Sequence, residues 1–207
     1  MYDTHYTGYM YAGVRLLTGA DGRPFEFDPG SFALELLLTG GPGSVNEMLR
    51  TPADLVDWLI DSRLANTAPL AGEQIHIRLS ELRVLKEFRD TMWTVARTVA
   101  HHGWPEPAQV ELINRCAETA MRLELDAIAE ARRWASPVTG ADVLGSAARE
   151  AVDIIGGRAA RLRECRAEDC DLLFFDTSRP GNRRWCSMRR CGNRRKIQAY
   201  RARGPDQ

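Results

Sequence analysis

Four of the five cysteines lie in the last quarter of the 207-residue chain, where they form two C-x4-C pairs. The first pair is Cys165 and Cys170, and the second is Cys186 and Cys191. Two closely spaced thiol pairs can supply the four sulfur ligands of a tetrahedral structural Zn²⁺ site. The alternatives are a disulfide pair or free buried thiols. The spacing favours one structural Zn²⁺ ion held by all four cysteines, whereas the isolated Cys116 is expected to be a small core residue.

The segment that carries these cysteines is too short and too polar to build a large core. Residues 158–207 hold few large apolar side chains, and modules of this size seldom fold without a metal or disulfides. The string DLLFFD predicts a strand, TSRPGN a turn and RRWC the return strand. A helix is expected after Gly192, with Asn193 as its cap. Four thiolate ligands leave no open position for water, so the metal is expected to be structural.

Charge is distributed unevenly along the chain. The whole sequence is neutral, with 28 basic and 28 acidic residues, but residues 158–207 hold 14 Lys and Arg against 6 Asp and Glu. Residues 1–157 therefore carry a net charge of −8 and form an acidic body. Such an asymmetry favours nucleic acid, or another anionic partner, for the basic segment.

The basic segment is rich in arginine rather than lysine. Of the ten basic residues between Thr177 and Pro205, nine are arginine. A guanidinium group can donate two hydrogen bonds at once to phosphate oxygens or to the edge of a guanine. We therefore predict that DNA is bound by Arg183, Arg184, Arg189, Arg190, Asn193, Arg194, Arg195, Lys196 and Arg201. Alternatively, Asn193 caps the helix and does not contact DNA. Two alternatives stay open: the segment binds RNA, or it docks on the acidic body, within one chain or across a homodimer.

The N-terminal half contains several turn and cap signals. The turn sequence GADGRP predicts a β-hairpin within residues 9–27. The apolar run in SFALELLLTGGPG fits either a buried strand or a short helix. Thr51, Pro52 and Asp54 mark the start of a helix, because they supply a hydroxyl cap, a proline in the first turn and an acid three residues on.

Apolar periodicity predicts three further helices, over residues 73–102, 106–119 and 141–157. Between the last two, MRLELDAIAE and RRWAS are expected to pair as strands, although the former could extend a helix. The expected buried stripes of the helix after Thr51 and of the last helix comprise Leu55, Val56, Trp58, Leu59, Ile60, Leu144, Ala148, Val152 and Ile155.

The sequence carries no signal for membrane insertion or catalysis. The N-terminus lacks the pattern of a secretion signal, and no stretch reaches the roughly 18 apolar residues that cross a bilayer. We expect a cytoplasmic protein without membrane contact, where paired cysteines bind metal. No phosphate loop, nucleophile elbow or HExxH motif occurs. We therefore expect no catalytic residue and no enzymatic activity.

The string RRWCSMRRCGNRRK, residues 183–196, resembles the CGNR zinc-finger family, named for the four residues at 191–194. The upstream C-x4-C pair, the string FFDTS and the ending YRAR match the same pattern. Members of this family carry an N-terminal ABATE domain, which is associated with stress-induced transcription regulation and with sensing of a small ligand. Here TPADL, with Trp58 and Leu59, is similar to that domain. ALELLLTGG replaces its ALDFVNT-like string, so no ligand-binding residue is carried over.

Together these features predict an α+β fold in two parts. Residues 1–157 form a helix-rich ABATE-like sensor domain with a small antiparallel sheet, and residues 158–207 form a treble-clef-like zinc finger with four cysteine ligands. The resemblance implies a stress-responsive transcription regulator that binds DNA through the finger and senses a small-molecule ligand through the N-terminal domain. The alternative is a zinc-stabilised protein-interaction module, or an RNA binder, without DNA contact.

Overall fold

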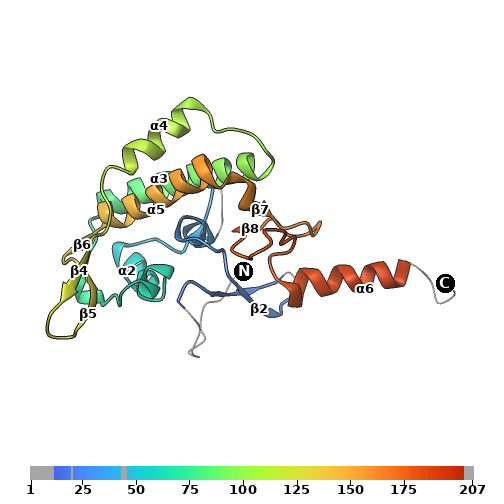
Figure 1. Ribbon diagram of the computed structural model, residues 1–207, viewed down its shortest axis with the longest axis horizontal. Coiled ribbons are helices and arrows are strands. Elements are labelled where there is room, and N and C mark those ends of the chain that lie inside the picture. The colour runs from blue at the N-terminus through green and yellow to red at the C-terminus, as the bar shows by residue number, and fades with distance from the viewer. Residues whose placement is uncertain (1–11, 20, 43–45, 203–207) are drawn as a thin grey trace.

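Three helices form the frame of the N-terminal body in the computed structural model, which describes residues 12–19, 21–42 and 46–202, except for the side chains of 199–202. Helix α3 (Leu79–Ala100) packs against α5 (Gly140–Gly157), and both contact α4 (Pro107–Cys116). Figure 1 shows α3 and α5 side by side beneath α4. The three helices predicted from periodicity are confirmed. Helix α3 begins later than predicted because residues 75–76 form a strand.

Helices α2 (Pro52–Ile60) and α5 both begin with a reciprocal capping box. At α2 the backbone N–H of Asp54 donates to Thr51 Oγ1 over 3.3 Å, and the N–H of Thr51 donates to Asp54 Oδ2 over 2.6 Å. Thr139 and Asp142 make the same pair of contacts at α5. The predicted helix start at Thr51 is therefore confirmed, because each box satisfies backbone donors that a helix leaves unpaired.

The buried stripes follow the predicted periodicity, with two errors. Leu55, Trp58 and Leu59 of α2 are buried as predicted and Val56 is half-buried, but Ile60, the last residue of the helix, is 38% exposed. In α5, Val152 is 42% exposed, so its predicted burial is also wrong. Ala148 is buried as predicted, and further small residues of α5 are buried with it, which lets the helix lie close to its neighbours; they are Gly140, Gly145, Ala147 and Ala151.

The apolar run after Ser31 is a helix and not a strand. It forms α1 (Phe32–Glu35), which continues as a 3₁₀ turn over Leu36–Thr39. Ser31 Oγ accepts the N–H of Leu34 as a cap. The segment is buried on almost every side, so it has no polar face to reveal a period, and its sequence cannot distinguish the two structures.

The strands form small two-stranded sheets. Three are antiparallel: β1 (Arg15–Thr18) with β2 (Pro24–Phe27), β4 (Leu123–Asp126) with β5 (Ala131–Trp134), and β7 (Leu162–Glu164) with β8 (Leu173–Phe175). The fourth pairs β3 (Ile75–His76) with β6 (Val138–Thr139) in parallel. The α+β class, the N-terminal hairpin and the β4–β5 pair are confirmed. No helix formed by the described residues has the length and apolar composition that a membrane crossing requires.

Residues on the two sides of the predicted domain boundary at residue 157 contact one another. Leu162, Leu173 and Phe175 belong to the core of the body, together with α3 and α5. The backbone N–H of Phe175 donates to Pro29 O over 2.8 Å, and Gly30, at φ +79°, leaves no room for a side chain, since a Cβ there would lie 2.1 Å from Phe175 O. The C-terminal segment is thus packed into the rest of the chain.

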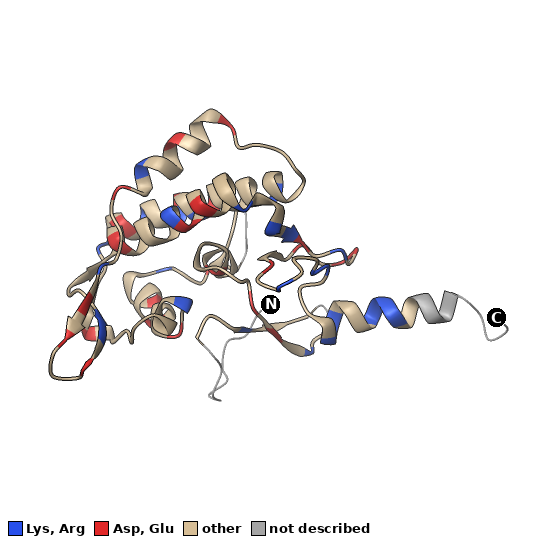
Figure 2. Cartoon of the chain, in the orientation of Figure 1, with Lys and Arg blue, Asp and Glu red and all other residues tan. Residues whose placement is uncertain are grey.

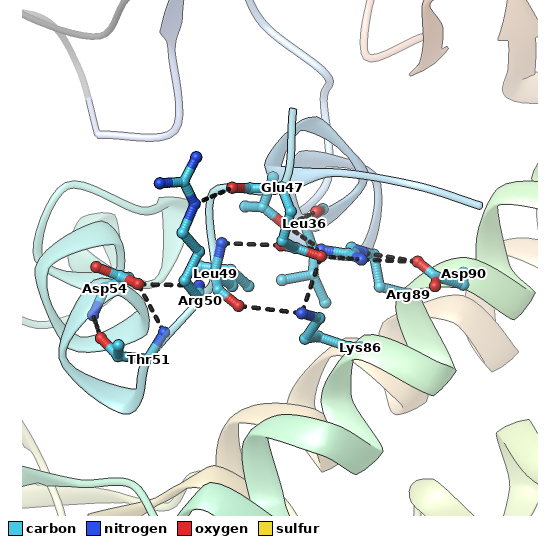
Figure 3. A network of polar contacts seen from close by, with 10 residues as sticks. Leu36, Glu47, Leu49, Arg50, Thr51, Asp54, Lys86, Arg89 and Asp90 are labelled. Atoms are coloured by element: carbon cyan, nitrogen blue, oxygen red, sulfur yellow. Dashed lines mark hydrogen bonds and ion pairs between the residues drawn. The ribbon is translucent and has the colours of Figure 1, made fainter. Parts of the chain in front are cut away.

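A buried arginine joins α3 to Glu47, which precedes α2 in the chain (Figure 3). The side chain of Arg89, on α3, is 1% exposed and donates to both carboxylate oxygens of Glu47, over 2.9 and 2.8 Å. Asp90 and Lys86 complete the network, with ion pairs of 2.8 Å to Arg89 and 3.0 Å to Glu47. Although burial acts to raise the pKa of Glu47, hydrogen bonds from Arg89, the backbone of Leu49 and Lys86 together outweigh it and lower that pKa to about 2.

Glu47→Gln is expected to lower the free energy of unfolding at pH 7 by about 3 kcal/mol, because Arg89 then keeps only Asp90 as a counter-charge. The pKa of Glu47 is about 2 in the folded protein against 4.5 ordinarily, so its charge stabilises the fold above about pH 4.5, and this contribution is lost as the pH falls toward 2. The difference between wild type and variant should therefore shrink between about pH 5 and pH 3, as measured by urea denaturation.

The control is Glu87→Gln, which removes an exposed carboxylate of α3. It should change stability by less than about 0.5 kcal/mol at any of these pH values. An equal, pH-independent loss in both variants would show that the ion pair with Arg89 does not stabilise the fold.

Candidate metal centre

The four paired cysteines converge on one point. Their sulfur atoms all lie within 4.8 Å of one another, and Cys186 Sγ is 3.6 Å from Cys170 Sγ and 3.5 Å from Cys191 Sγ. Four sulfurs at the Zn–S distance of about 2.3 Å in a tetrahedron stand roughly 3.8 Å apart, so the cluster fits this ion. None of the five cysteines forms a disulfide in the structure. The predicted zinc-binding set is therefore brought together.

The thiols of the cluster are too crowded to ionise independently. Hydrogen bonds from Cys170 and Cys186 lower the pKa of the Cys165 thiol to about 2. The same contact with Cys165 raises the pKa of Cys170 to about 12, and neighbouring sulfurs also raise that of Cys186. Ionisation of one thiol therefore disfavours ionisation of its neighbours. A divalent cation allows all four thiols to lose their protons. Because the ligands are all sulfur and largely buried, the ion has a structural role.

A short turn places the first cysteine pair between β7 and β8. The N–H of Cys165 donates to Leu172 O over 2.9 Å, which continues the β7–β8 pair, and the N–H of Cys170 closes a turn onto Ala167 O over 3.1 Å. Strand β8 confirms the prediction for DLLFFD, but its partner is β7. The predicted return strand RRWC is wrong: residues 183–186 form no strand, and Arg184 O accepts only the N–H of Arg166.

The second pair enters a helix through an unusual turn. Met188–Gly192 forms a π-helical turn that leads directly into α6 (Asn193–Ala202). A Cβ at Gly192 would lie 2.7 Å from Met188 Sδ and 3.2 Å from the Trp185 ring, so a side chain there would displace Met188. The helix after Gly192 is confirmed, but Asn193 is not its cap. Asn193 already has helical dihedral angles, and Ser187 occupies the extended position before the turn.

Arg183, predicted to bind DNA, is directed into the protein. Its guanidinium lies 4.1 Å from the ring centre of Phe174 and donates to the carbonyl oxygens of Asp28, Trp185 and Cys186. Its backbone N–H also donates to Asp176 Oδ2 over 2.7 Å. Asp176 is fully buried, and although burial acts to raise its pKa, hydrogen bonds from Ser178 and Arg183 lower it. Arg183 therefore links the second cysteine pair to the segment before α1.

Two more predicted DNA contacts, Arg190 and Arg194, lie against the sulfur cluster. Arg190 lies 4.3 Å from the ring centre of Phe25 and 3.9 Å from Cys170 Sγ. Arg194 donates over 3.5 Å to Cys191 Sγ and forms a two-pronged ion pair with Asp169, at 2.6 and 2.7 Å. Four thiolates on a divalent cation carry a net charge of −2, so these guanidinium groups stabilise the centre electrostatically.

Other basic side chains of the segment remain exposed. Among the described residues, none of the following has a side-chain hydrogen bond or ion pair: Arg166, Arg179, Arg184, Arg189, Arg195 and Lys196. Four of them belong to the predicted DNA-binding set, and Asn193 is exposed beside them. Arg166 and Arg179 were outside the predicted set. The side chain of Arg201, also predicted, lies outside the described residues.

The β1–β2 hairpin covers the metal centre, which the sequence reasoning missed. Leu17, Phe25 and Phe27 form one apolar cluster with Phe174 and three of the cysteines, separate from the core of the body. The alternation of buried Phe25 and Phe27 on β2 shows that one face of the hairpin is covered. No signal in the sequence connects this face to residues at the far end of the chain, because the pattern marks a buried face and not its partner.

Comparison with protein families assigns both parts of the chain. Residues 161–204 match the CGNR zinc finger, and residues 30–158 match the ABATE family, described as "Putative stress-induced transcription regulator". The second match spans more than half of the chain. The chain belongs to the ABATE family. In this member an N-terminal ABATE region is followed by a C-terminal CGNR finger, as the sequence motifs predicted. No curated protein matches the chain.

In this ABATE protein Cys186→Ser is expected to abolish stable zinc binding, because it removes one of the four sulfur ligands. Bound metal should fall from about one ion per chain to well below half an ion after dialysis against a chelator. Amide exchange should accelerate in β1, β2, β7 and β8, which contact the centre, and should stay slow in α3 and α5. Metal analysis and hydrogen exchange measure these outcomes.

Cys116→Ser provides the matched control, because Cys116 is half-buried on the core of the body and away from the cluster. It should keep full zinc content. Retention of one ion per chain by the Cys186 variant would show that the ligand set is wrong.

Proposed function

We propose that this protein is a transcription regulator that binds DNA through its CGNR finger and helix α6, and that it acts in the cytoplasm as a binding protein without enzymatic activity. The family description supports the regulatory role. The N-terminal body would then set the activity of the finger through the β1–β2 hairpin and β8. Nothing in this proposal requires an open metal position, because the zinc ligands are all supplied by cysteine.

The observation that carries the proposal is the set of six exposed basic side chains without partners among the described residues. Three of the predicted arginines are held by the metal centre, so the remaining charge is not needed for its stability. Basic side chains that are exposed, unpaired and held on a rigid module are suited to phosphate contact. Their arginine-rich composition also suits two-pronged contacts with guanine.

Helix α6 has the placement that groove binding requires. It extends away from the body (Figure 1), and Figure 2 shows Lys and Arg but no Asp or Glu along it. Its first residue follows the metal centre directly, so the orientation of the helix is fixed at that end. A helix with one free side fits the major groove of DNA, which is about 12 Å wide.

Protein binding is the second candidate, and two exposed apolar residues favour it. Met188 in the π-turn and Ile197 on α6 are both 52% exposed. Apolar side chains on a projecting helix are typical of surfaces that dock in a protein groove. The charge around them makes DNA the better candidate, because a partner protein would need an acidic surface as well as an apolar pocket.

Replacement of Arg184, Arg189 and Arg195 by glutamine is expected to weaken DNA binding and its dependence on salt. If six phosphates are contacted, the logarithm of the association constant falls with the logarithm of salt concentration with a slope near −5, and near −3 after loss of three contacts. Fluorescence anisotropy with a random duplex of about 20 base pairs measures both slopes.

The matched control replaces three exposed arginines of the body, Arg83, Arg115 and Arg132, by glutamine. This variant has the same net charge as the finger variant and should keep the slope of the wild type. If both variants lose affinity equally, the binding is a non-specific charge effect. If the wild type does not bind duplex DNA at low salt but binds single-stranded RNA or an acidic protein, the DNA proposal is wrong.

A further inference from the structure

A cavity of about 390 Å³ lies where the ABATE body meets the CGNR finger. The body contributes the 3₁₀ turn after α1, the loop that follows it and the outer side of α3, including Trp93 and Thr94. The hairpin contributes Leu17. The finger contributes residues 171–173, directly after the ligand Cys170. The cavity is therefore shared between the two parts of the chain.

The walls of the cavity are mainly apolar. Leucines approach from three separate segments, and the indole of Trp93 forms another wall. A closed apolar cavity of about 150 Å³ is already large enough to bind benzene. A volume of 390 Å³ lies within the range of natural small-molecule sites, and it would accept a bicyclic ring system.

Described residues on the loop side of the cavity lie next to the buried arginine network of Figure 3. Gly40, Gly41 and Asn46 line the cavity, and Glu47, bound to Arg89, directly follows. Thr39, just before the loop, also accepts a 3.4 Å hydrogen bond from Arg89. This part of the wall is therefore held in place before any ligand binds, which reduces the entropy lost on binding.

The charges at the cavity select the class of ligand. Among its described lining residues Asp171 carries a charge and no lysine, arginine or histidine is present. An anion placed beside Asp171 would be repelled, whereas a neutral molecule with a hydrogen-bond donor could donate to the Asp171 carboxylate, which is exposed at the finger side. The apolar walls favour a ligand that is otherwise hydrocarbon.

We propose that this cavity binds a neutral, largely apolar molecule of about bicyclic size that has one hydrogen-bond donor, and that the bound molecule stabilises the zinc finger. Leu172 and Leu173 connect the cavity to the zinc site. The carbonyl of Leu172 accepts the N–H of Cys165, and Leu173 pairs in β8 with Glu164 next to Cys165. A ligand packed on these leucines restrains the backbone between two zinc ligands. An effect of the bound molecule on DNA binding rests on the proposed function above, but its effect on zinc retention does not.

The test uses the full zinc-loaded chain with two matched probes, neutral 2-naphthol and anionic 2-naphthoate. We expect 2-naphthol to bind with a dissociation constant on the order of 100 µM, by isothermal titration calorimetry, and 2-naphthoate to bind at least about tenfold more weakly. At a free concentration of ten dissociation constants, 2-naphthol should slow zinc release to an excess of chelator by roughly tenfold.

Two variants fill the cavity from opposite walls: Leu38→Trp in the 3₁₀ turn and Thr94→Trp at an exposed position of α3. Either should weaken 2-naphthol binding at least about tenfold by removing the space that the ring occupies. Leu79→Trp, at a 51% exposed position of the same helix and outside the cavity lining, should bind like the wild type. Asp171→Asn should reduce the preference for the neutral probe.

The outcomes separate the parts of the proposal. Absence of saturable 2-naphthol binding, or equal binding by folded cavity-filling variants, would show that the cavity is not a ligand site. Binding without any change in zinc release would overturn the link to the finger. Loss of DNA binding in the arginine variant together with failure of the probe tests would refute this inference and leave the proposed function intact.

Discussion

Convergence of four cysteine sulfurs is the constraint on which the rest of the C-terminal structure depends. Their mutual distances, all within 4.8 Å, cannot be maintained by four thiolates alone, since like charges at that separation repel strongly. A divalent cation removes this repulsion and leaves a residual negative charge. Arg190 and Arg194 then lie beside the sulfurs and neutralise that remainder. The metal centre thus explains why part of the arginine-rich sequence is folded inward.

The centre also explains why the finger is not an independent appendage. Its apolar cluster is completed by Leu17, Phe25 and Phe27 of the N-terminal hairpin. Strands β7 and β8 face the core of the body on one side, and Phe175 is joined to Pro29 through the backbone. A module of about fifty residues is too small to bury enough surface by itself, so it takes part of its core from elsewhere in the chain. This sharing gives the body a physical route by which it could influence α6.

Local signals in the sequence were sufficient for most elements. Capping at Thr51, the turn before Pro24 and the C-x4-C pairs each depend on neighbouring residues, and each was placed correctly. The local errors concern the burial of Ile60 and Val152 and the cap at Asn193, and the larger errors concern partners distant in the chain. RRWC was the predicted partner of β8, which pairs instead with β7, and DNA was the predicted partner of Arg183, which binds the carbonyl of Asp28. The sequence marks a residue as basic or a strand as apolar, but tertiary packing decides what it contacts.

The identity of the metal ligands is the central claim, and X-ray absorption spectroscopy at the zinc K edge tests it most directly. The full chain, purified with zinc under reducing conditions, should give a single shell of four sulfur atoms at about 2.3 Å and no nitrogen or oxygen ligand. A shell that contains nitrogen or oxygen, or a zinc content well below one ion per chain, would contradict a centre built from Cys165, Cys170, Cys186 and Cys191.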